Sequence, residues 1–181
     1  MTDSQTIQSV SLKQLQELLQ QMGYRVTESE QAGNRQLLSA SQGIGFAVRL
    51  GNPAHEADQA LDYTLSCALR VQGEMPAGIE SAWNIGKRFA RLAVQGEFLV
   101  LEMDVIVAGG VAPSYLQATA ELWDRLLQEF LLFLRQHAAA NNEANNEANS
   151  ADKGEAVAAQ QEAAQVTAEP TEIEQTEAAQ A

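Results

Sequence analysis

Apolar residues recur along the first 137 residues with two different periods, and these periods predict the order of helices and strands. Spacings of three and four, as between Leu12 and Met22, indicate helices with one buried side. Strict alternation, as between Tyr63 and Val71, indicates strands with one buried face. The pattern predicts helices at 12–22, 79–89 and 115–137, and strands at 24–28, 36–41, 43–50, 63–71, 91–94 and 98–107.

The predicted order, α-β-β-β-β-α-β-β-α, favours an α+β fold in which an antiparallel sheet carries helices on one side. The strand at 63–71 supports this fold, because its polar positions carry hydroxyl groups and Arg70. Gly96 lies between the last two strands, where a tight hairpin requires a positive φ. Ser11 with Gln14 fits a capping box at the start of the first helix.

Composition divides the chain into a leader, one domain and a tail. Residues 1–10 are short and mostly polar, and we expect a flexible leader there. Residues 11–137 form the predicted α+β domain. Residues 138–181 contain the repeat NNEANNEAN and no aromatic residue. Such a segment buries too little apolar surface to offset the entropy of ordering it, so a disordered acidic Ala/Glu/Gln/Asn-rich tail is predicted.

The formal net charge is −13, and it is unevenly spread. Residues 1–137 hold 15 acidic and 10 basic side chains, a balance of −5, whereas 138–181 hold nine acidic side chains and Lys153, a balance of −8. Neither part concentrates the Lys and Arg that phosphate binding requires, which argues against nucleic acids and anionic membranes as partners. The polar start and the single cysteine predict a cytoplasmic protein.

Two carboxylates stand two residues apart in the strand predicted at 98–107. Glu102 and Asp104 would share one face, about 7 Å apart, which suits a general acid/base pair or half of a metal site. The ordinary interpretation is a solvated strand face on which Arg91 and Lys87 reduce the repulsion. We favour the solvated face. A small ligand- or metal-binding domain, or an enzyme that uses this face, is the alternative.

The other reactive residue types have structural explanations. His137 ends a predicted helix, where its charge suits the helix dipole, and His55 has no second ligand at metal spacing. Cys67 lies on the apolar side of its strand, which indicates a buried thiol. Gly109-Gly110 matches no phosphate-binding motif. The sequence therefore predicts no catalytic residue, no cofactor and no metal site.

The predicted last helix is more apolar than a helix lying on a sheet requires. Around 130–134 its apolar side chains point in every direction, so a second surface must cover them. Another copy of the chain or a helix of a protein partner would supply that cover, and we expect a homodimer built through this helix or the sheet edge next to it. The predicted interface consists of Leu127, Phe130, Leu131, Leu132, Phe133 and Leu134.

A series of short motifs runs through the predicted domain. In order, they are a strand, an Asn-containing helix, an Arg/Phe pair, a hairpin with an LEMD strand, and a GGV turn before the last helix. Their residues are Asp62–Leu65, Trp83-Asn84, Lys87–Arg91, Glu97–Asp104 and Gly109–Val111. This series resembles the YbjN family, and the resemblance covers about Ser11 to Arg135.

The resemblance implies a regulator. The family is labelled as bacterial sensory-transduction regulators, it carries no established catalytic residue or cofactor, and its fold is similar to the α+β dimer of type III secretion chaperones. We therefore expect a non-enzymatic regulatory or chaperone-like domain that binds an unidentified protein partner. Its family-motif core would be Trp83, Asn84, Arg88, Phe89, Glu102 and Asp104. Helical spacing places Trp83 and Phe89 of this set on the buried side of the middle helix.

Overall fold

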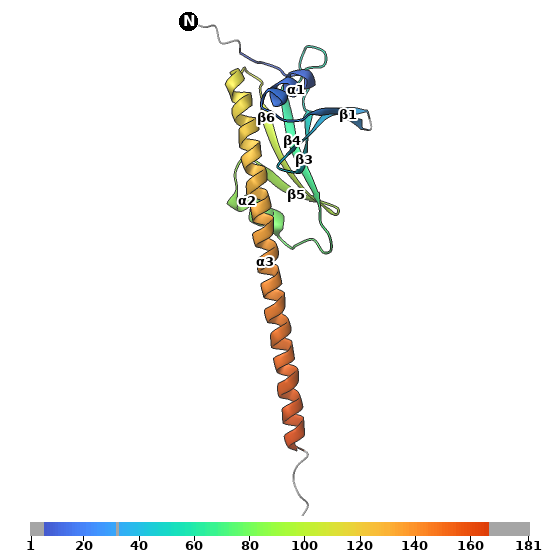
Figure 1. Cartoon of the computed structure of the whole chain (residues 1–181), viewed down its shortest axis with the longest axis vertical. Coiled ribbons are helices and arrows are strands. Elements are labelled where there is room, and N and C mark those ends of the chain that lie inside the picture. The colour runs from blue at the N-terminus through green and yellow to red at the C-terminus, as the bar shows by residue number, and fades with distance from the viewer. Residues whose placement is uncertain (1–5, 32, 167–181) are drawn as a thin grey trace, which may run out of the picture. The chain divides into compact units, whose positions relative to one another are not determined.

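The computed structural model describes residues 6–31 and 33–166, and it confirms the predicted α+β fold and the order of its elements. Figure 1 shows the course of the chain. The helices are α1 (Leu12–Gln21), α2 (Ile79–Gly86) and α3 (Pro113–Val166). The strands are β1 (Thr27–Gln31), β2 (Asn34–Ser41), β3 (Ile44–Leu50), β4 (Asp62–Arg70), β5 (Arg91–Gln95) and β6 (Phe98–Ile106).

The six strands form one antiparallel sheet in the order β1-β2-β3-β4-β6-β5. Five of the six strands lie within two residues of their predicted bounds, and β1 starts three residues later than expected. The Ser11–Gln14 capping box is present at the start of α1, because each side chain accepts from the other residue's backbone N–H. The hairpin between β5 and β6 turns at Gly96, where φ is +60°.

The chain divides into two units, residues 1–135 and 136–181. The first unit contains the sheet, α1, α2 and the part of α3 that ends at Arg135. In the second unit, residues 136–166 are helical, whereas the sequence placed the end of this helix at His137. Ala, Glu and Gln are strong helix formers, so helix propensity accounts for the extension without an apolar stripe. The disordered tail predicted at 138–181 stays a prediction, and residues 167–181 lie outside the described residues.

The hydrophobic core lies between one face of the sheet and the helices of the first unit. Strand residues on this face alternate with exposed positions, as the two-residue period requires. The core residues of α3 include Trp123, Leu127 and Phe130, and those of α1 are Leu12, Leu15 and Leu19. The largest strand residues of the core are Leu37, Phe46, Tyr63, Leu65, Leu92, Leu99, Leu101 and Met103.

The opposite side of the sheet is called the open face here: it consists of the strand residues whose side chains point away from the core. Residues directly paired across an antiparallel sheet share a face, so the registers define it. One row crosses all six strands and contains Thr27, Leu38, Ala47, Ser66, Glu102 and Arg91. Ala40, Gly45 and Ala68 on the same face are exposed, so no helix of the described first unit covers them.

The leader is partly ordered, contrary to the prediction. Ile7 forms a bridge with Val111, and Val10 forms a bridge with Ala60. Val10 is completely buried. In a mostly polar leader, the apolar Ile7 and Val10 were the sequence signal for this order, and their pairing partners lie far along the chain. Residues 1–5 lie outside the described residues.

Trp83 is a core residue, as the spacing predicted. Its ring packs edge-on against Phe130 and Phe133, with ring centroids 5.3 Å apart in each pair. Trp83→Ala should lower the free energy of unfolding by about 3–5 kcal/mol, because it leaves a large cavity. Urea unfolding measures this cost. The matched control is Ile85→Ala on the same helix, which is 86% exposed and should cost no more than about 0.5 kcal/mol. A Trp83→Ala cost below about 1 kcal/mol would contradict the assignment.

Candidate functional site

The carboxylates of β6 lie on the open face and are neutralised by two arginines. Arg91 contacts both of them: its Nη2 lies 2.8 Å from Oε2 of Glu102, and its Nη1 pairs with Oδ2 of Asp104. Arg49 of β3 donates to Oε1 of Glu102 at 3.0 Å. Thr64 of β4 donates its hydroxyl to Oδ1 of Asp104 at 2.6 Å. Every carboxylate oxygen of the pair therefore has a partner.

These partners keep Asp104 ionised. Burial alone would raise the pKa of Asp104, but the hydrogen bonds from Thr64 and Arg91 and the charge of Arg91 together lower it below the usual aspartate range. A general acid needs the opposite shift. A metal would have to displace both arginines from the same oxygens. The geometry therefore supports the interpretation of the pair as an ion-paired strand face.

Of the two cations predicted to lie beside the carboxylates, one is found there and one is not. Arg91 occupies the predicted place beside the carboxylates. Lys87 does not, because its Nζ lies 2.8 Å from Oε2 of Glu129 in α3 and 5.8 Å from the centre of the Trp83 ring. Arg49 and Thr64 also contact the carboxylates and were not predicted to do so. Their alternate positions in β3 and β4 indicated the open face, but only the register of the sheet shows which residues they meet.

Trp83 and Asn84, from the family motif, close the free edge of β5. The Trp83 indole Nε1 donates to the carbonyl oxygen of Ala90 at 3.1 Å. The Asn84 amide donates to the carbonyl of Leu92 at 2.9 Å and accepts from the backbone N–H of Leu92 at 2.8 Å. The Asn84 side chain thus takes the place of a neighbouring strand. Edge strands with free hydrogen-bonding groups attract other strands, and this contact protects β5.

Phe89 is not a core residue, and its prediction as one is wrong. It lies after the end of α2 with a φ of +73°, and 63% of it is exposed. The guanidinium of Arg88 lies over its ring, 4.9 Å from the ring centre. The helix ends at Gly86, so the helical period that placed Phe89 on the buried side does not extend to it. A positive φ is unusual for a bulky aromatic residue and costs conformational energy.

The predicted interface on α3 is corrected in part. Leu127 and Phe130 are buried in the core of their own protomer, so they are not accessible to a partner. Leu131, Phe133 and Leu134 are half-buried, and Leu132 is 55% exposed. The helix is apolar on several sides because it packs against the sheet and also against α2, where Phe130 and Phe133 contact Trp83.

The remaining candidate residues do not assemble into a site. Cys67 is buried, and burial raises the pKa of its thiol to about 11, so the thiol stays protonated at neutral pH. Gly110 adopts a φ of +94°, and a Cβ there would come within 2.5 Å of the Thr6 side chain, which explains the glycine structurally. Over the described residues, no three His, Cys, Asp or Glu side chains are grouped to hold a metal ion.

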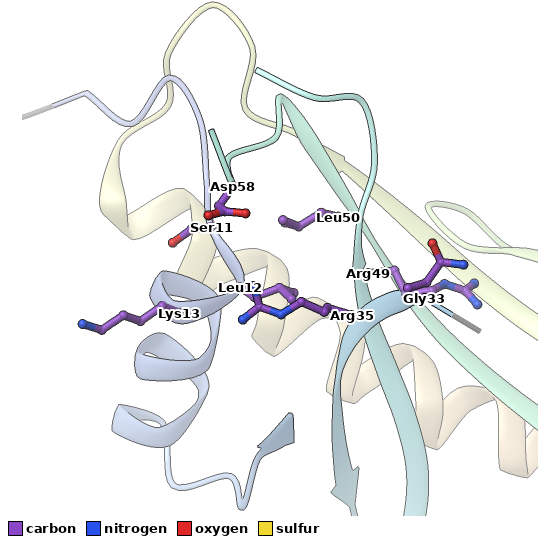
Figure 2. A pocket seen from close by; sticks show the side chains of 9 residues that line it. Ser11, Leu12, Lys13, Gly33, Arg35, Arg49, Leu50 and Asp58 are labelled. Atoms are coloured by element: carbon purple, nitrogen blue, oxygen red, sulfur yellow. The ribbon is translucent and has the colours of Figure 1, made fainter. Parts of the chain in front are cut away.

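A hollow of about 600 Å³ lies where the start of α1 approaches β2 and β3, and Figure 2 shows the side chains that line it. Arg35 extends toward the first turn of α1, Asp58 lies across the hollow from it, and the Lys13 ammonium points away. Two of its cations already have carboxylate partners outside the lining. Arg35 donates to Glu28 at 2.6 Å, and Arg49 donates to Glu102. The hollow therefore offers little uncompensated charge to a ligand.

The fold and the site define a class: an α+β domain with an open, ion-paired sheet face. The chain belongs to the YbjN family, described as "Putative bacterial sensory transduction regulator", whose model matches residues 11–136. This confirms the resemblance seen in the sequence. No curated protein and no solved structure matches the chain. In the part of the chain that the structure describes, no helix is both long and apolar enough to span a membrane.

The lowered pKa of Asp104 predicts a pH-dependent contribution to stability. A carboxylate with a lower pKa in the folded state stabilises the fold above its unfolded pKa of about 3.9, and this contribution disappears as the pH falls through the folded value. Asp104→Asn should therefore lower the free energy of unfolding at pH 7 by up to about 1 kcal/mol, as expected for a largely exposed pair.

The difference between wild type and Asp104→Asn should shrink below about pH 4. Urea unfolding of both proteins between pH 2.5 and pH 7 measures it. Thr64→Val removes one of the two hydrogen-bond donors to Asp104. It should therefore show a smaller loss of stability at pH 7 than Asp104→Asn does. A difference that stays constant over this pH range would contradict the assignment.

Proposed function

We propose that this protein is a regulatory or chaperone-like protein-binding domain of the cytoplasm that acts without catalysis and as a homodimer. The family description supports a regulatory role. The protein-binding part rests on one observation: large apolar side chains lie on the surface, while the groups suited to chemistry are paired with each other.

The exposed apolar side chains are more than isolated exceptions. Ile85 is 86% exposed, Phe89 is 63% exposed, and both flank the cationic residues 87–88. Single exposed apolar residues are common on soluble proteins. Phe89, however, is held on the surface in a backbone conformation that costs energy, and such strain is concentrated at functional positions. We therefore assign the surface around Phe89 to contact with a protein partner.

A ligand-binding or enzymatic role for Glu102 and Asp104 is the alternative function. It would require the two carboxylates to exchange their arginine partners for a metal or a substrate, and the contacts of Arg49 and Arg91 oppose that exchange. A panel of metals and metabolites, tested by thermal shift, distinguishes the two. A ligand that raises the melting temperature by several degrees, and whose effect is lost in Glu102→Gln, would contradict a non-enzymatic binding domain.

The homodimer has a direct test in light scattering. Twice the chain mass of 19.6 kDa predicts a particle of about 39 kDa at a protein concentration near 100 μM. With a net charge of −13 on each chain, association must come from apolar burial, and salt should screen the repulsion between the chains. The dimer should therefore persist or strengthen at 1 M NaCl. A mass of one chain throughout this range would contradict the homodimer.

A further inference from the structure

We propose that the second copy of the chain docks on the open face of the sheet, so that the two sheets of the dimer pack face to face. This inference rests on the proposed homodimer and assigns its interface. It replaces the interface expected on α3, where Leu127 and Phe130 are already used in the protomer core. The observations that carry it are the two sheet edges, the size of the open face, its charge and its exposed apolar side chains.

Neither edge of the sheet suits a second copy. At β5, the side chains of Trp83 and Asn84 form hydrogen bonds with the carbonyl of Ala90 and with the backbone N–H and carbonyl of Leu92. At the other edge, β1 carries Glu28 and Glu30. Charged residues on an edge strand discourage pairing with another strand, and Glu30 and the Glu28–Arg35 ion pair place charge along this edge. Two copies that associate through the sheet are therefore directed to its face.

The open face is large enough for a stable dimer. Its strands are five to nine residues long. At a rise of about 3.4 Å per residue and a spacing of about 4.8 Å, the six strands cover roughly 700 Å². Two such faces would bury about 1,400 Å², which lies within the range of about 1,200–2,000 Å² for specific protein interfaces.

The charge of the open face favours a second copy over other partners. Three arginines, Arg49, Arg70 and Arg91, share the face with three acidic residues, Asp62, Glu102 and Asp104. The face is therefore neutral, whereas residues 1–137 as a whole carry −5. Two identical acidic proteins repel each other least where each presents a neutral surface. An acidic or basic partner would find no matching excess of charge there.

Exposed apolar side chains on the open face also favour docking of a second copy. Leu38 is 41% exposed, Phe98 is 42% exposed and Ile106 is 63% exposed, and all three lie on the open face at different places on the sheet. Between them the face carries the short side chains of Ala40, Ala68 and Ala93, together with Gly45. A second sheet can therefore approach closely over these small residues, and packed sheets lie about 10 Å apart.

The test places a long charged side chain at the centre of the open face. Ala68→Arg lies at an exposed position on β4, so the monomer can accommodate the new side chain in solvent. Ala40→Arg on β2 makes the same change at a second exposed position. The matched control is Ala118→Arg, which adds the same charge at an exposed position of α3. Circular dichroism and the melting temperature establish that each variant is folded.

The proposal expects light scattering at 100 μM to give about 39 kDa for the wild type and for Ala118→Arg, and about 19.6 kDa for a folded Ala68→Arg or Ala40→Arg. A dimer that both open-face variants leave intact would overturn this interface, while the proposed homodimer would stand. The exposed Leu132 would then be the next surface to test. A wild type that is monomeric throughout would overturn the homodimer and this inference together.

Discussion

The free edge of the sheet at β5 is where the sheet, α2 and α3 are joined. An edge strand presents unpaired backbone groups that other chains can extend. Here α2 covers the edge with side chains: the Trp83 indole bonds to Ala90, and the Asn84 amide bonds to Leu92 in both directions. The same Trp83 ring packs against Phe130 and Phe133 of α3. One tryptophan thus connects the end of the sheet, the middle helix and the last helix, and the short α2 is held at the edge by both contacts.

The sealed edge has a consequence for function. A protein that binds others through strand addition would keep such an edge available, whereas this one closes it at Ala90 and Leu92 and leaves a whole sheet face open. The carboxylates on that face are paired with Arg49 and Arg91, so their charges are compensated before any partner arrives. Buried ion pairs lose much of their stabilisation to desolvation unless all their groups keep partners. Here every carboxylate oxygen of the pair has one, which suits a surface that another protein covers.

The sequence was most informative where one local period extends over a whole element. The alternation from Tyr63 to Leu69 and the spacing from Leu12 to Leu19 predicted β4 and α1, because one buried face is enough to produce each pattern. The sequence pattern was misleading where a contact between distant segments decides whether a residue is buried. Phe89 continues the helical spacing in the sequence, yet α2 stops at Gly86, and Lys87 has an extended backbone and pairs with Glu129 of α3. Phe130 looked like surplus apolar surface because Trp83 of α2, whose ring packs against it, lies more than forty residues away in the sequence.

The sealing of β5 is tested most directly by amide hydrogen exchange at two residues of the same edge. The backbone N–H of Leu92 bonds to Asn84, whereas that of Val94, two residues further along, points to the same side and lies beyond the reach of this contact. The account predicts that the Leu92 amide exchanges far more slowly than the Val94 amide, and that Asn84→Ala brings the Leu92 rate close to that of Val94. Equal rates in the wild type, or a Leu92 rate unchanged by Asn84→Ala, would contradict it.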